Sequence, residues 1–232
     1  MSKSAAKRLM NNLPTLPDLP GASRRAQYSA STKRALVEAA AKLFTEHGYA
    51  STSLDAIVSD AQVTKGALYH HYSGKQALFE AVFAQVETMA AEAISKAVKG
   101  SKDPWQKSLD GLRAFLEVVQ DPTYRRVVIQ EGPAVLGYER FREREERSSF
   151  AIVLDIVDNV LSAGPWELEQ PMIEVFTRIF FGALSSAGDS VATSEAPEET
   201  SARVEAAIGF MLQGMRALVD QGVELVDPVT GS

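Results

Sequence analysis

The chain has 232 residues and a net charge of −6, with 45% hydrophobic and 23% charged residues. This composition predicts a water-soluble globular protein of one large domain or two small ones. The sequence contains no cysteine, which excludes disulfides and thiolate chemistry and fits a cytoplasmic location. We expect no membrane partner, because no charge-free apolar run reaches the ~18 residues of a membrane span. The N-terminus also lacks the apolar segment of a secretory signal.

Charge is divided unevenly along the chain. Residues 1–76 hold ten Lys and Arg against five Asp and Glu, a net charge of +5. Because the whole chain carries −6, the remaining residues carry −11. A basic N-terminal part on an acidic body is typical of a protein that meets a polyanion such as DNA with one end only.

Residues 1–28 contain three prolines and five Lys or Arg, with little hydrophobic periodicity. We predict a flexible basic arm. It is either a solubilising tail or a segment that reaches the DNA backbone or minor groove, and the sequence does not decide between the two.

The next part of the chain predicts three helices in close succession. Apolar residues at helical spacing indicate a first helix over residues 31–47, and Gly48 is a natural stop. Ser53 and Thr64 are each placed to cap the N-terminus of a further short helix. The third helix spans residues 65–71, and a tight turn separates it from the second.

The helix at residues 65–71 is suited to the major groove of DNA. It leaves Lys65, Tyr69, His70 and His71 to face outward and contains no carboxylate. Its donors can therefore reach phosphates and base edges without repelling the polyanion. Helix-turn-helix geometry also occurs in proteins that bind no DNA, so these residues alone leave that alternative open.

This stretch resembles the N-terminal DNA-binding domain of the TetR family of bacterial repressors. The resemblance covers roughly residues 30–80 and is carried by Thr52-Ser53-Leu54, by the run from Val63 to Tyr69, and by Tyr72 and Lys75. Gln62 departs from the pattern, because the family commonly has glycine there. If that position is left-handed, glutamine costs about 1 kcal/mol.

The resemblance implies that residues 29–76 bind double-stranded operator DNA. Ser53, Tyr69 and Lys75 are then expected to hold phosphates. Lys65 and His70 are expected to face base edges, and His71 to do either. The full set of expected DNA contacts is Ser53, Thr64, Lys65, Ala67, Tyr69, His70, His71 and Lys75.

Residues 77–232 are predicted to form helices joined by loops, without strands. A long apolar pattern from Lys75 to Gly100 predicts a helix that links the DNA-binding part to the rest. Asp103-Pro104 and Asp121-Pro122 are start signals for two more helices, and Gly132-Pro133 is expected to break the second. Further helices are predicted at 138–163, from residue 171, and at 198–221. The fold class is therefore all-α, with an N-terminal three-helix helix-turn-helix domain and a larger helical ligand-binding and dimerisation domain.

The larger domain is expected to bind a second copy of the chain and a small-molecule effector. The last helix has an apolar stripe wider than one contact needs, and the resemblance implies a homodimer. The candidate interface residues are Phe180, Ala183, Ala187, Ile208, Met211, Met215 and Leu218. The candidate ligand contacts are Trp105, Phe115, Tyr124, Trp166, Phe176 and Phe180, with ordinary core packing as the alternative for each.

Enzymatic chemistry is not expected. The three histidines lie at positions 47, 70 and 71, so residues 72–232 cannot form a histidine-based catalytic or metal centre. No nucleophile elbow or glycine-rich phosphate loop is present. We therefore expect no cofactor and no metal, and an effector that is a mainly apolar organic molecule.

The interpretation is a ligand-responsive transcriptional regulator, a repressor released from a palindromic operator. The rival class is an all-α dimer that binds a protein partner and no DNA. The sequence does not identify the effector, the operator or the regulated genes, and it does not separate repression from activation.

Overall fold

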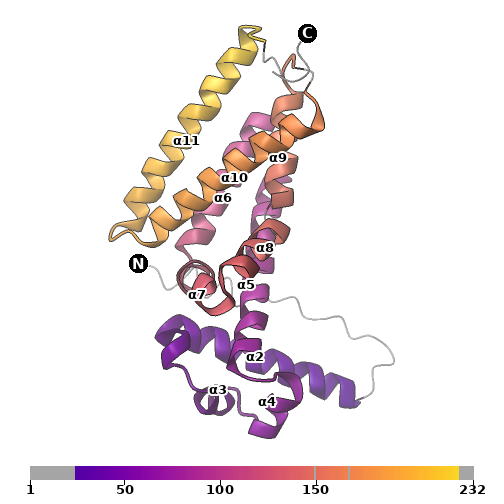
Figure 1. Cartoon of the computed structure of the whole chain (residues 1–232), viewed down its shortest axis with the longest axis vertical. Helices are drawn as coiled ribbons and strands as arrows, with labels where there is room; N and C mark the ends of the chain where they lie inside the picture. Colours follow the sequence, from indigo (N-terminus) through magenta and orange to yellow (C-terminus); the bar gives the residue numbers. More distant parts are fainter. Residues whose placement is uncertain (1–23, 149, 167, 225–232) are drawn as a thin grey trace. The chain divides into compact units, whose positions relative to one another are not determined.

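The computed structural model describes residues 24–148, 150–166 and 168–224. Within these ranges it contains ten α-helices, one π-helix and no strand (Figure 1). The all-α prediction is confirmed. Residues 1–23 of the predicted arm lie outside the described ranges. No helix in those ranges combines the length and apolarity that a membrane span requires.

The chain forms two compact units. Unit 1 comprises residues up to Glu87 together with Asp121–Phe141, and unit 2 comprises Thr88–Gln120 with the residues from Arg142 onward. The predicted division after residue 76 concerns function and stays a prediction. Compactness divides the chain differently, since it places eleven further residues and a distant segment with the helix-turn-helix.

The first described element of unit 1 is helix α2, Arg24–Ser51, which starts seven residues earlier than predicted. Residues 24–28, assigned to the flexible arm from the sequence, are thus helical. Gly48 interrupts the helix with φ 80° and ψ 165°, a backbone conformation that glycine adopts without strain. Helices α3, Leu54–Asp60, and α4, Lys65–His71, follow, and then α5, Lys75–Val98, which runs through both units.

Local capping explains the short helices. Ser53 Oγ accepts the Ala56 N–H, and Thr64 Oγ1 accepts the Ala67 N–H, both at 3.1 Å. Each hydroxyl satisfies one of the N–H groups that a helix start leaves free. In the turn between α3 and α4, Gln62 has φ 54°. The departure from the family pattern therefore falls on a left-handed residue, with the expected cost of about 1 kcal/mol.

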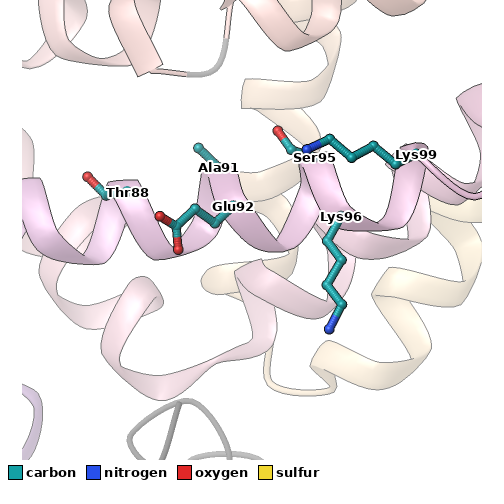
Figure 2. A pocket seen from close by; sticks show the side chains of 6 residues that line it. All are labelled: Thr88, Ala91, Glu92, Ser95, Lys96 and Lys99. Carbon is teal, nitrogen blue, oxygen red and sulfur yellow. The ribbon is translucent and has the colours of Figure 1, made fainter. Parts of the chain in front are cut away.

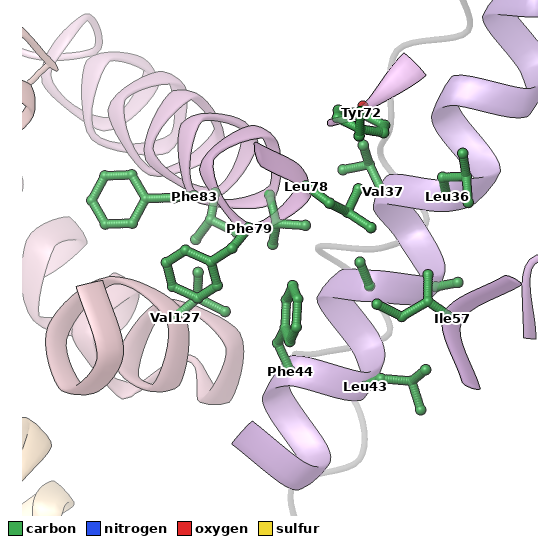
Figure 3. Packing of buried hydrophobic residues seen from close by; sticks show 14 of the residues in the cluster. Leu36, Val37, Leu43, Phe44, Ile57, Tyr72, Leu78, Phe79, Phe83 and Val127 are labelled. Atoms are coloured by element: carbon green, nitrogen blue, oxygen red, sulfur yellow. The ribbon is translucent and has the colours of Figure 1, made fainter. Parts of the chain in front are cut away.

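The core of unit 1 packs α2 against α3, α4 and the first half of α5 (Figure 3). Phe44 and Phe79 meet edge to face with ring centroids 5.4 Å apart, and Phe83, Ile57 and Val127 are fully buried beside them. This buried aromatic core fixes the positions of α3 and α4, which are too short to be stable alone.

The segment 121–141 closes this core. Asp121 Oδ1 accepts the N–H groups of Thr123 and Tyr124, so the predicted start signal is confirmed. The helix that follows is a π-helix, η1, Tyr124–Glu131, and α7, Gly132–Leu136, continues from it. The predicted break at Gly132-Pro133 is wrong. Gly132 is helical, and a Cβ there would lie 2.8 Å from the Phe83 ring, so this glycine serves close packing.

Among the described residues, unit 2 contains the second half of α5, residues 142–148 of the helix that crosses its boundary, and four complete helices. They are α6, Pro104–Gln120; α9, Phe150–Ser162; α10, Gln170–Ala192; and α11, Pro197–Asp220. The helix predicted at 138–163 is divided into α8, Tyr138–Ser148, and α9. Figure 1 shows α10 and α11 side by side as an antiparallel pair.

Candidate nucleic-acid interface

Helix α4 presents a polar face to solvent. Lys65 and His70 are exposed, and the Tyr69 side chain is 57% exposed, whereas Leu68 is buried. Two of the predicted contacts, Ala67 and His71, are half-buried. One side of α4 is therefore held by the core, and the other is available to a partner.

The two capping hydroxyls lie at the starts of α3 and α4, and both residues are exposed. Each oxygen already accepts a backbone N–H, as described above. A hydroxyl keeps its own O–H as a donor while its oxygen accepts. Ser53 and Thr64 can therefore hold their helices in place and still donate to a phosphate.

An ion pair links the start of α4 to α3. Lys65 Nζ lies 2.5 Å from Asp55 Oδ1, and both side chains are largely exposed. The hydrogen bond and charge of Asp55 raise the pKa of Lys65 above its ordinary value. Sequence reasoning noted that α4 itself has no carboxylate but missed that α3 supplies one. The pairing depends on how the two helices pack, and spacing alone gave no signal of it.

The two histidines end α4 with their rings close together. The ring centroids of His70 and His71 are 5.1 Å apart, at an interplanar angle of 71°. Burial lowers the pKa of His71, and the charges of His70 and Lys33 act in the same direction. His71 is therefore mainly neutral at pH 7 and offers a hydrogen-bonding ring rather than a fixed positive charge.

The Lys75 ammonium is hydrogen-bonded to backbone carbonyls of the protein itself. Its Nζ donates to the carbonyl oxygens of Tyr49 at 2.8 Å, Thr52 at 2.9 Å and Ala50 at 3.4 Å. It also lies 4.4 Å from the centroid of the Tyr49 ring. An ammonium has three N–H donors, and here each has a carbonyl partner. Lys75 thus closes the end of α2, and its expected phosphate contact stays a prediction.

Glu131 holds the other side of the same turn. The Tyr49 N–H donates to Glu131 Oε2 at 2.6 Å, and Arg126 Nε lies 3.2 Å from Glu131 Oε1. The Arg126 Nε–H makes no well-directed hydrogen bond, so its contact with Glu131 is ionic. A Cβ on Gly48 would lie 2.6 Å from the Glu131 carboxylate. Sequence reasoning missed this residue, which is 82 positions from Tyr49.

The predicted dimer residues divide between surface and core. Ala183, Met211 and Leu218 are exposed, whereas Phe180, Ala187, Ile208 and Met215 are half-buried. Phe180 and Met215 pack against the buried cluster of Val157, Leu161 and Ile173. The structure adds three large exposed apolar side chains that sequence reasoning missed, Val175 and Ile179 on α10 and Phe210 on α11. Phe210 lies outside the main stripe of α11, and periodicity therefore gave no reason to single it out.

The predicted ligand contacts do not surround one described cavity. Tyr124 packs against the core of unit 1, while Trp166, Phe176 and Phe180 pack against the α9–α10 cluster of unit 2. Trp105 is buried in α6, and Phe115 lies against Gly188. Their assignment to a ligand site stays a prediction.

Two grooves are described in unit 2, and other residues line them. One, of about 610 Å³, runs along α5 and is lined by Thr88, Ala91, Glu92, Ser95, Lys96 and Lys99 (Figure 2). The other, of about 420 Å³, shares Ser95 and Lys99 with it and extends to α9. Among the described residues, no group of three or more His, Cys, Asp or Glu side chains is placed to hold a metal ion.

Two family models match this chain. Residues 36–82 match "Bacterial regulatory proteins, tetR family", and residues 105–215 match "Tetracyclin repressor-like, C-terminal domain". The first covers the helix-turn-helix, and the second covers most of the helices that follow.

Individual proteins agree with the two models. A TetR-family regulator from Pectobacterium atrosepticum has a solved structure with a TM-score of 0.71 and 27% identity, covering 83% of this chain and 97% of its own. The TetC protein of transposon Tn10 from Escherichia coli is 30% identical over 49% of this chain, and the probable acrEF/envCD operon repressor of Escherichia coli K12 is 29% identical over 42%. These alignments span only 57% and 45% of the two relatives. The matches to both family models, together with the shared fold, show that the chain belongs to the TetR family of DNA-binding transcriptional regulators.

Proposed function

We propose that this protein is a homodimeric repressor that acts in the cytoplasm and leaves a palindromic operator when a small, mainly apolar organic molecule binds. The observation that carries the proposal is the exposed polar face of α4. Lys65, Tyr69 and His70 project from a short helix whose other side is locked into an aromatic core. Such a face can enter the major groove without rearrangement.

DNA contacts are assigned within unit 1. Tyr69 and the capping hydroxyls of Ser53 and Thr64 donate to phosphates, which set the register of the protein on the duplex. Lys65 and His70 face base edges, and His71 adds a hydrogen-bonding ring. Lys75 acts indirectly, because it holds the turn that joins α2 to α3 and does not itself contact DNA.

Dimerisation is assigned to α10 and α11. Ile179 is 63% exposed and Phe210 is 78% exposed, with Val175, Met211 and Leu218 on the same two helices. Burying these apolar side chains needs a partner surface of the same kind, and a second copy of the chain supplies it. Two recognition helices about 34–36 Å apart then require an operator with two-fold symmetry.

The effector is assigned to unit 2. Its aromatic cluster includes Trp166, Phe176 and Phe180, and its sequence contains no histidine or cysteine. That chemistry favours an apolar organic molecule over a metal ion. Because α5 belongs to both units, a ligand that shifts its C-terminal half would change the placement of the DNA-binding part. A coupling of about 1–3 kcal/mol would weaken operator binding about 5–150-fold.

Repression, rather than activation, is supported by the similarity to the probable acrEF/envCD operon repressor of Escherichia coli K12. The test begins with selection of duplexes bound by the protein from random-sequence DNA. Lys65→Ala should change the preferred bases, and a thermal-shift screen of small organic molecules should yield ligands that release the selected duplex. Ligands that stabilise the protein without changing DNA affinity would contradict the proposed response. A protein that selects no DNA at all would favour the rival class, a dimer that binds a protein partner.

A further inference from the structure

The Asp55–Lys65 pair lies at the edge of the proposed DNA-reading helix. Asp55 is the second residue of α3, Lys65 is the first residue of α4, and their charged atoms are 2.5 Å apart. The exposed fractions of the two side chains are 67% and 61%. The Asp55 carboxylate therefore places a negative charge beside α4. A surface that bound DNA through charge alone would carry only positive charges there.

Stability does not account for this pair. An acidic residue in the first turn of α3 stabilises that helix only slightly, wherever its side chain points. An ion pair between two exposed side chains also adds little to stability. The pair does, however, change what Lys65 offers to DNA, because it removes most of the net charge at the start of α4.

We propose that Asp55 is a specificity-determining residue, which holds Lys65 away from phosphates and directs it to base edges. This inference rests on the proposed DNA-reading role of α4. An ammonium that gives one N–H to Asp55 keeps two for acceptors such as O6 and N7 of guanine. A phosphate in the same place would bring its negative charge close to the Asp55 carboxylate. The pair thus penalises a phosphate contact more than a base contact.

The same helix offers a matched control. Asp60, at the other end of α3, pairs with Lys42 of α2 at 2.6 Å, and its side chain is 33% exposed. Asp60→Asn removes the same charge from the same helix but leaves Lys65 paired. A general effect of net charge on DNA affinity should appear in both variants, whereas an effect transmitted through Lys65 should appear only in Asp55→Asn.

The experiment measures affinity for a random-sequence duplex and for the duplexes selected by the wild-type protein, over a range of salt concentrations. Asp55→Asn frees Lys65 for a phosphate, which should steepen the slope of log K against log salt on random DNA by about 0.9. If the variant and the wild type bind random DNA equally at 1 M salt, the variant should bind it about eightfold more tightly at about 0.1 M salt. Preference between bases at the position read by Lys65 should fall at least about fivefold, within the range of one lost base contact. Asp60→Asn should show neither change.

Lys65→Ala and the double variant Asp55→Asn/Lys65→Ala complete the cycle, with thermal melting as the check on folding. If Lys65→Ala leaves DNA binding unchanged, the proposed role of α4 fails. If Lys65→Ala changes base preference but Asp55→Asn behaves like Asp60→Asn, only the role of Asp55 fails. The role of Asp55 also fails if Asp55→Asn tightens random-DNA binding as much in the Lys65→Ala background as in the wild type. The effect would then come from overall charge.

Discussion

Replacing Lys75 by methionine removes the ammonium group and keeps most of the apolar stem. The wild-type ammonium donates to the carbonyls of Tyr49 and Thr52 at 2.8 and 2.9 Å, in a half-buried setting, and to the exposed Ala50 carbonyl at 3.4 Å. The variant leaves these carbonyls without their partner beside the Gly48 turn. We therefore expect a loss of stability, with the fold retained.

The magnitude follows from the two shorter bonds. A hydrogen bond to a charged group contributes about 1.5–3 kcal/mol, and the longer, exposed bond adds little. Water can reach part of the freed carbonyls, so we expect a net loss of about 2–4 kcal/mol. For a chain of this size, 1 kcal/mol shifts Tm by about 2–4 °C. Calorimetry should therefore show a Tm lower by about 5–15 °C for Lys75→Met.

The salt dependence of DNA binding separates this role from a phosphate contact. If the Lys75 ammonium stays on the carbonyls, Lys75→Met should leave the slope of log K against log salt unchanged at a temperature where the variant is folded. A true phosphate contact would lower the slope by about 0.9. An unchanged Tm together with a reduced slope would refute the reasoning and restore the contact implied by the family resemblance.

Three further predictions concern other parts of the chain. Glu131→Gln removes the charge beside Arg126 and should lower Tm by a few degrees, about 1 kcal/mol, while Glu195→Gln, the same change at an exposed residue between α10 and α11, should leave Tm unchanged. Phe210→Glu places a charge on the proposed dimer face and should yield monomer in sedimentation velocity, whereas Tyr138→Glu, at another exposed aromatic residue, on α8, should stay dimeric. Because burial lowers the pKa of His71, the folded chain binds fewer protons than the unfolded chain below about pH 6.5. The stability of the wild type should therefore fall relative to His71→Gln as the pH is lowered from about 7 to about 5, and equal pH profiles would contradict this.

Features set by local chemistry could be predicted from the sequence. The limits of α4, Lys65–His71, match the prediction because Thr64 caps its start and the apolar pattern defines its buried side. Asp103 and Asp121 likewise start the next two helical segments as expected. The conditional prediction for Gln62 also holds, since its backbone is left-handed.

Features that depend on distant packing could not be predicted. Gly132-Pro133 looked like a break, yet the glycine is helical and lets the chain approach the Phe83 ring. Glu131 finds the Tyr49 N–H only once the fold brings the two together. The same holds for Asp55 and Lys65, whose side chains meet through the turn between α3 and α4. Residue patterns report which side of a helix is buried, but they do not report what lies opposite it.

Selection of bound duplexes from random-sequence DNA tests the central claim most directly. The account predicts that the selected sequences share an inverted repeat, with half-site centres about one helical turn, ~34–36 Å, apart. It also predicts that Lys65→Ala alters the preferred bases symmetrically in both half-sites. Selection of no common sequence, or of a single asymmetric site that Lys65→Ala leaves unchanged, would contradict the claim that paired α4 helices read a palindromic operator.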